Sequence, residues 1–131
     1  MTSEKIDDKC HKSHFVFFTN SSLMSNEVIF ETEEINITND GQITRAKNGK
    51  VNFVEENFEV IGDSFIYDKK KKILIVTKGE SILNNDNLII EADEITYNRN
   101  TLEIIAKNNV RLEDVLNKSS ISSEELIYNL K

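Results

Sequence analysis

The residues best able to do chemistry are adjacent pairs of carboxylates, which occur five times within residues 28–131. Two carboxylates held across a cleft, one of them with a raised pKa, can hydrolyse a glycosidic bond by acid and base catalysis. Successive residues of a β-strand point to opposite faces of the sheet, so two adjacent acids in a strand cannot flank one bond. The pairs therefore favour solvated strand borders that discourage unwanted pairing, and not catalysis. They are Glu33-Glu34, Glu55-Glu56, Asp93-Glu94, Glu113-Asp114 and Glu124-Glu125.

No other group of residues has the spacing of a catalytic or metal centre. Cys10, His11 and His14 lie together near the N-terminus, and three ligands there make a poor metal site. No serine stands in a Gly-x-Ser-x-Gly turn, and the oxygen-rich segment 84–87 lacks the glycine and final glutamate of a calcium loop. A single cysteine excludes an internal disulfide. The sequence predicts a protein that is not an enzyme and that uses no metal or other cofactor.

The charge of the chain limits its partners. Its 131 residues include 16 basic and 23 acidic ones, for a net charge of −7. Nucleic-acid binding needs clustered Lys and Arg for the phosphates, and the only such cluster here is 69–72, four lysines in a row. A lysine-rich hairpin tip is usually just solvated, and it also suits contact with the phosphates of anionic lipids. Nucleic acid is therefore not an expected partner.

Composition and periodicity indicate strands and not helices. Alanine, the best helix former, occurs only at positions 46, 92 and 106. Short runs at 51–53, 58–60, 102–104 and 110–112 alternate apolar, polar, apolar, which is the period of a half-buried strand. No apolar run approaches the roughly 18 residues of a membrane-spanning helix. The sequence predicts one all-β domain.

An internal repeat organises most of the chain. Similar segments occur at 62–68, 92–98 and 123–129, with a weaker copy at 32–38. Their anchor residues, Ile37, Tyr67, Tyr97 and Tyr128, recur about every 30 residues. Self-similarity at such a fixed period is typical of repeats that stack on one another.

Each repeat is expected to contain about three short strands. Gly49, Gly79 and Asn109 each lie 12 residues after an anchor, and Gly and Asn tolerate a left-handed backbone, so these positions are expected turns. The polar segments 39–41, 68–72 and 98–100 are expected turns as well. Two packings remain open: two sheets face to face with a closed core, or repeats stacked along an axis, which the regular period favours. A stack leaves a strand edge at each end that must be capped, charged or paired.

Residues 1–27 differ from the repeats. The segment is polar and charge-balanced up to His14, and then 15–18 (Phe-Val-Phe-Phe) leads into small polar residues. This resembles the end of a secretory signal, but the apolar stretch is short and its upstream flank carries acids. A tail and a degraded signal peptide both fit. The folded domain is expected at 28–131, where the last repeat breaks off after one strand, either because the chain is shortened there or because that strand meets a partner.

The repeated segments resemble the OstA-like family, which includes the periplasmic lipopolysaccharide-transport protein LptA and the N-terminal domain of the outer-membrane assembly protein LptD. The family pattern is roughly Ala-Asp-x-hydrophobic-x-Tyr-Asp, a turn, an alternating strand, and Ala-x-Gly-Asn-Val-x-Leu. Segments 92–98 and 106–112 follow it most closely. Asn108-Asn109 stands in place of Gly-Asn, Ser81 in place of an apolar residue, and Ile37 in place of Tyr. The resemblance covers residues 28–131.

The resemblance implies a twisted, slightly open β-jellyroll, in which two antiparallel sheets of stacked repeats form a V-shaped trough. The candidate lining consists of the apolar positions in the alternating strands, each of which is also consistent with plain core packing. These lipid-binding candidates are Val51, Phe53, Phe58, Val60, Phe65, Tyr67, Ile73, Ile75, Ile95, Tyr97, Leu102, Ile104, Val110 and Leu112.

The resemblance also implies a non-enzymatic module that binds lipopolysaccharide in the periplasm and carries it to the outer membrane. Each buried methylene contributes about 0.8 kcal/mol, so an apolar trough can hold acyl chains without a specific polar group. Its expected partners are lipopolysaccharide, through the lipid A acyl chains, and other OstA-like domains or further copies of itself, joined by their strand edges. The alternative is a structural or adhesive β-repeat module with a closed core.

Overall fold

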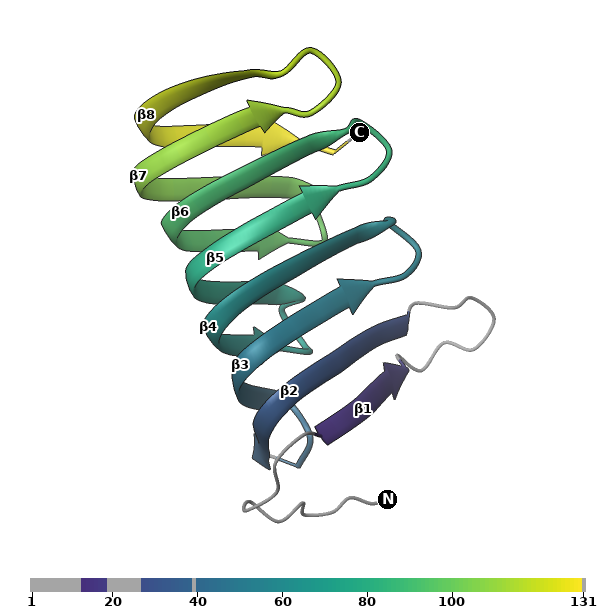
Figure 1. Ribbon diagram of the computed structural model, residues 1–131. Coiled ribbons are helices and arrows are strands. Elements are labelled where there is room, and N and C mark those ends of the chain that lie inside the picture. The colour runs from purple at the N-terminus through teal and green to yellow at the C-terminus, as the bar shows by residue number, and fades with distance from the viewer. Residues whose placement is uncertain (1–12, 19–26, 39, 131) are drawn as a thin grey trace.

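The computed structural model describes residues 13–18, 27–38 and 40–130, which form a single antiparallel sheet of eight strands (Figure 1). Each strand pairs with the next one along the chain, so the sheet order is the chain order. The all-β prediction is confirmed, and the described residues include no helix able to cross a membrane. The strands are β1 (Ser13–Phe18), β2 (Glu27–Thr38), β3 (Ile43–Phe53), β4 (Phe58–Asp68), β5 (Ile73–Leu83), β6 (Leu88–Asn98), β7 (Glu103–Asp114) and β8 (Ser119–Asn129).

The 30-residue period corresponds to two long strands and two turns, and not to three short strands. Strands β3, β4, β5 and β6 each have 11 residues. Four-residue turns at 54–57, 69–72, 84–87 and 99–102 connect consecutive strands. The turns expected around 68–72 and 98–100 are therefore confirmed, and the segment 40–42 is a turn as well.

Three of the expected turns are instead bends inside continuous strands. Gly49, Gly79 and Asn109 lie within β3, β5 and β7. The left-handed backbone expected at both glycines occurs one residue earlier, at Asn48 (φ 56°) and Lys78 (φ 55°), whereas in β7 both Asn108 (φ 71°) and Asn109 (φ 57°) have it. One or two residues in this conformation redirect a strand without ending it, because the ladder resumes on both sides. The sequence motif thus marks a change of strand direction.

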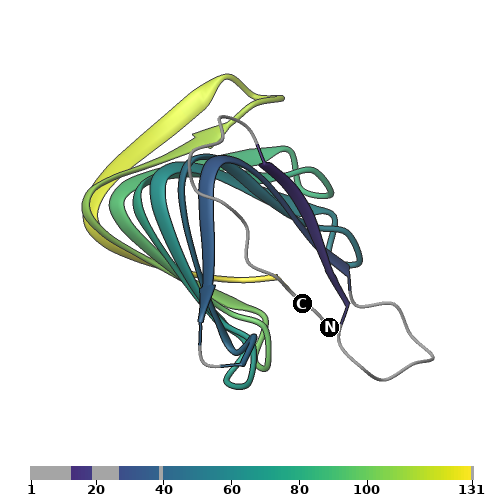
Figure 2. The same cartoon turned by 90° about the horizontal axis from the view of Figure 1, so that it is seen from below.

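The bends fold the sheet into a V with two arms, which is visible when the stack is viewed end on (Figure 2). The expected V is thus one continuous sheet, and it is not closed into a barrel. Small residues line the crease, where Gly49 pairs with Gly62 and Gly79 pairs with Ala92. The first arm comprises 27–32, 49–53, 58–62, 79–83, 88–92, 110–114 and 119–123, and the second comprises 34–38, 43–47, 64–68, 73–77, 94–98, 103–107 and 125–129.

Strand β1 lies inside the segment 1–27 that was expected to be a tail or degraded signal. It pairs with the first half of β2, from Ser13 opposite Thr32 to Phe18 opposite Glu27. The other residues of this segment, including Cys10 and His11, lie outside the described part of the chain. The domain boundary at residue 28 stays a prediction.

Candidate functional site

The inward faces of the two arms form one apolar interior. Because side chains alternate along a strand, the antiparallel register brings inward residues of successive strands into continuous columns. One column of the second arm runs from Thr44 through Tyr67, Leu74 and Tyr97 to Ile104. All five side chains are fully or almost fully buried.

Most of the candidate lining residues lie in this interior. Ten of the fourteen are buried between the arms, and Leu112 is partly buried and packs against them. Leu102 is not in a strand: it ends the turn 99–102 with a left-handed backbone (φ 59°). The ten buried candidates are Val51, Phe53, Phe58, Val60, Phe65, Tyr67, Ile95, Tyr97, Ile104 and Val110.

The expectation that Ile73 and Ile75 line the interior is wrong. Leu74 and Val76 point inward instead and are fully buried, whereas Ile75 is 39% exposed. The segment 73–76 (Ile-Leu-Ile-Val) is apolar at every position, so its pattern does not indicate which face is buried. The pairing with β4, which places Leu74 opposite Tyr67, decides the face.

Aromatic rings fill the interior near the ends of the arms. The Phe53 ring lies 5.0 Å from the Tyr97 ring and 5.8 Å from the Phe58 ring, centroid to centroid. The Tyr97 and Phe58 rings are 4.8 Å apart and edge to face. Such pairs add roughly 0.5–1.5 kcal/mol each to the free energy of area burial. The rings therefore bind the free end of the first arm to the second arm.

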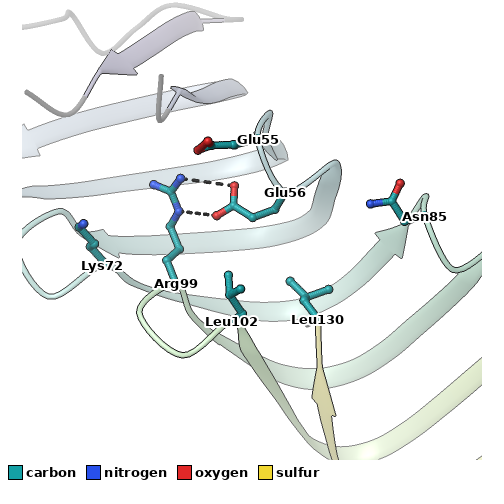
Figure 3. Close-up of a pocket in the computed structure, with 7 residues that line it drawn as sticks. All are labelled: Glu55, Glu56, Lys72, Asn85, Arg99, Leu102 and Leu130. Atoms are coloured by element: carbon teal, nitrogen blue, oxygen red, sulfur yellow. Dashed lines mark hydrogen bonds and ion pairs between the residues drawn. The ribbon is translucent and has the colours of Figure 1, made fainter. Parts of the chain in front are cut away.

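The open side of the V, which we call the mouth, lies between two rows of turns. Turns 54–57, 84–87 and 115–118 end the first arm, and turns 40–42, 69–72 and 99–102 end the second. A groove of about 430 Å³ lies between the rows (Figure 3). Glu55, Glu56 and Asn85 come from the first arm, and Lys72, Arg99, Leu102 and Leu130 from the second.

A charged pair crosses the mouth above the aromatic rings. Arg99 Nε donates a hydrogen bond of 2.8 Å to Glu56 Oε2, and Nη2 donates one of 3.4 Å to Oε1 (Figure 3). Only 5% of the Arg99 side chain and 13% of the Glu56 side chain are exposed. The guanidinium carbon of Arg99 lies 5.1 Å from the centroid of the Phe53 ring, within cation–π range.

Two tyrosine hydroxyls complete this network. Tyr97 Oη donates to Glu56 Oε2 at 3.1 Å, and Arg99 Nη1 donates to Tyr67 Oη at 3.2 Å. Burial alone lowers the pKa of Arg99, but its hydrogen bonds to Glu56 and Tyr67 outweigh that and raise the pKa, so Arg99 stays charged. Burial and the neighbouring Glu56 carboxylate raise the pKa of Tyr97, which therefore remains a donor.

A second hydrogen bond crosses the mouth one repeat later. Tyr128 Oη on the second arm donates to Asp86 Oδ2 on the first arm, at 2.5 Å. Asp86 holds the same place in its turn, 84–87, that Glu56 holds in 54–57. The anchor tyrosines 97 and 128 thus make equivalent contacts in successive repeats. Sequence reasoning identified these tyrosines as anchors but missed their acidic partners, which are 41 and 42 residues away in the chain.

Titration of the tyrosines tests the hydrogen bond between Tyr128 and Asp86. Partial burial, together with the hydrogen bond to the Asp86 carboxylate and its negative charge, raises the pKa of Tyr128 to about 12. We expect Asp86→Ala to return the Tyr128 pKa toward its ordinary value of 10.0, because the anion that opposes tyrosinate is gone. The ultraviolet absorbance of tyrosinate measures this, with Tyr128→Phe to assign the signal. An unchanged titration in Asp86→Ala would contradict the contact.

The interior is exposed at the β8 end of the stack. Ile121 lies opposite Leu112 on the inner face, yet 63% of Ile121 is exposed. Leu126 and Tyr128, on the same face of β8, are only partly buried. Among the described residues, no strand pairs with the other edge of β8. This end therefore presents both an unpaired strand edge and an apolar surface that continues the interior.

Nothing in the described residues suggests metal or acid–base chemistry. They contain no group of three or more His, Cys, Asp or Glu residues that could hold a metal ion. Glu55 and Glu56, one of the carboxylate pairs, occupy a turn and not a strand border, and Glu56 is bound to Arg99. The arrangement is suited to binding an apolar molecule with a polar end at the mouth.

Comparison with known families identifies a match over most of the chain. A family model described as LptA/(LptD N-terminal domain) LPS transport protein matches residues 16–103. The match begins within β1 and ends at the first residue of β7, so it includes the mouth residues Glu56 and Arg99 but not the repeated segments 106–112 and 123–129. A search of curated proteins found no match.

Proposed function

Because this chain belongs to the LptA/(LptD N-terminal domain) family of lipopolysaccharide transport proteins, we propose that it shields lipopolysaccharide acyl chains between its two arms. The family is a transport family of the cell envelope and not a family of enzymes, and it is the OstA-like family that the repeats resemble. We propose that this chain acts in the periplasm and delivers lipopolysaccharide toward the outer membrane.

The observation that carries the proposal is the apolar interior that continues to an exposed end. Acyl chains bind through area removed from water, at roughly 25 cal/mol per Å², and need no directed bonds. The inner columns provide such area in every repeat, and at β8 they include Ile121, Leu126 and Tyr128, which are accessible. An acyl chain can enter there by continuing the column that the strands already form.

The unpaired edge of β8 supports a role in assembly. An exposed strand edge presents a row of N–H and C=O groups that readily pair with another strand. We propose that a second OstA-like domain, or a further copy of this chain, adds its edge to β8. Its inner face would then cover Ile121 and extend the interior.

The lysine segment 69–72 fits the polar end of the same ligand. It forms the turn that ends the second arm, and Lys72 lines the groove at the mouth. We propose that these lysines contact lipid phosphates while the acyl chains lie in the interior.

Photo-crosslinking of the purified domain tests the shielding function. Crosslinking residues placed at Phe53, Tyr97 and Leu112 face the interior, and those at Asn52 and Arg111 face outward. After incubation with lipopolysaccharide, we expect crosslinks at the three inward sites and at least tenfold fewer at the outward sites, because the ligand lies between the arms.

Two outcomes separate the candidate functions. The interior is fully packed in the middle of the stack of strands, where Phe53, Phe58 and Tyr97 are 0% exposed. This packing favours, as a second candidate, the structural module with a closed core. Absence of crosslinks at every inward site, with a melting temperature that lipopolysaccharide does not change, would support that module and overturn the transport function.

A further inference from the structure

We propose that the mouth is a side entrance for acyl chains and that repeated tyrosine–acid hydrogen bonds, here called latches, hold it closed in the unloaded domain. The first latch is Tyr97 with Glu56, reinforced by Arg99, and the second is Tyr128 with Asp86. The inference rests on the proposed function, because it concerns how the ligand reaches the interior.

The latches are the polar contacts that join the free ends of the arms. The arms are one sheet at the crease, so their separation at the mouth depends on what crosses between the two rows of turns. Glu56 and Asp86 come from turns of the first arm, whereas Tyr97, Arg99 and Tyr128 belong to the second. Aromatic and apolar side chains also join the ends of the arms, and acyl chains can replace contacts of that kind.

The repetition of the latch argues for a role beyond local stability. Residues 56 and 86 are 30 apart and occupy the same position of their turns, and residues 97 and 128 are the anchors of successive repeats. A ligand with several acyl chains spans more than one repeat, so each latch closes one section of the entrance. Opening one section at a time requires less free energy at each step than separating the two arms along their whole length.

The two latches differ in strength. The first is nearly buried and includes a charged pair, and water and salt screen a buried pair much less than an exposed contact. Tyr128 and Asp86 are more exposed, and the hydrogen bond that joins them lies at the surface. The section nearest β8 therefore opens first, next to the end where Ile121 is already exposed.

The test measures uptake of lipid A with a fluorescent acyl chain by the full-length chain. Tyr128→Phe and Tyr97→Phe each remove one hydroxyl that crosses the mouth. Gln42→Ala is the matched control, because Gln42 Nε2 donates to Asp68 Oδ1 within the second arm and belongs to neither latch. We expect Tyr128→Phe to load about fivefold faster than the unmodified chain, the effect of one hydrogen bond. The double variant should load faster still, and Gln42→Ala should load at the rate of the unmodified chain.

A measurement without lipid keeps the test independent of uptake. Spin labels at Glu55→Cys and Thr101→Cys, both exposed and in opposite turns, report the width of the mouth in a Cys10→Ser background. Glu56→Gln weakens the first latch while keeping the shape of the side chain. We expect a broader distance distribution, with a population at longer distances, in Glu56→Gln than in the labelled parent.

The outcomes distinguish the latch from the function on which it rests. If all variants bind lipid A with equal rates and the label distances do not change, the latch is overturned and the transport function stands. If neither the variants nor the unmodified chain take up lipid A, the proposed transport function is wrong. Faster loading in both latch variants and not in Gln42→Ala supports the latch.

Discussion

Gly49→Ala is expected to lower the free energy of unfolding by about 3 kcal/mol, because no space exists for a side chain at the crease. A β-carbon there would overlap the backbone oxygen of Glu31 and lie 2.6 Å from the Thr32 Cα. Both atoms belong to the backbone of β2, which pairs with Gly49, so relief requires the two strands to move apart. Urea denaturation followed by circular dichroism measures the loss.

Two other glycines serve as controls for this prediction. At Gly79 the nearest atoms belong to the side chains of Val76 (2.8 Å) and Ile95 (3.1 Å), which can shift, so Gly79→Ala should cost less. Gly41 has nothing within 4 Å but has φ 91°, so Gly41→Ala should cost only about 1 kcal/mol of backbone strain. Equal losses in Gly49→Ala and Gly41→Ala would contradict the close approach of β2 and β3 at the crease.

The crease also shows how far the sequence could predict the fold. Local signals were sufficient for the all-β class, the period and the turns around 68–72 and 98–100, because alternation and turn residues act over a few positions. They were not sufficient to distinguish a turn from a bend, since Gly and Asn suit both conformations. Asn48-Gly49 bends β3 because β2 and β4 continue past it on both sides, which is a property of the neighbouring strands and not of the dipeptide.

The candidate site, too, could be predicted from the sequence only in part. Alternation of apolar and polar residues predicted the inward positions Phe58 and Val60, whereas the wholly apolar run around Ile75 gave the wrong face. The latches could not be predicted, because Glu56 and Arg99 come from turns 43 residues apart that only the V shape brings together. In the sequence Glu56 is half of a carboxylate pair and Arg99 is a turn residue.

The proposed transport requires different rearrangements at the packed centre of the stack and at its exposed β8 end. At β8 the interior is open, and a ligand needs no rearrangement to touch Ile121. At Phe53 the rings leave no exposed surface, so acyl chains must displace protein contacts with contacts of their own. Because an acyl chain replaces apolar contacts with similar ones, the exchange costs little once the mouth is open.

Phe53→Ala is expected to lower the free energy of unfolding by about 3–5 kcal/mol, the usual cost of a buried Phe-to-Ala change. Phe53 contacts the rings of Phe58, Tyr67 and Tyr97 and lies beneath the Arg99 guanidinium. Its removal leaves a cavity between the free ends of the arms, beneath the mouth. The adjacent Val54, which is 45% exposed in the turn, is the control, and Val54→Ala should change stability by less than about 0.5 kcal/mol.

Lipid distinguishes a carrier from a closed core in this same variant. If acyl chains occupy the interior, lipid A at about 100 times its dissociation constant stabilises the folded state by about 2.7 kcal/mol. Because the Phe53→Ala cavity lies on the path of the chains, the variant should bind lipid A at least as tightly as the unmodified protein and regain much of its lost stability. The opposite result is that lipid A changes the free energy of unfolding of none of the three proteins, Phe53→Ala, Val54→Ala and the unmodified chain. That result would indicate that the arms enclose a closed core and not a passage for acyl chains.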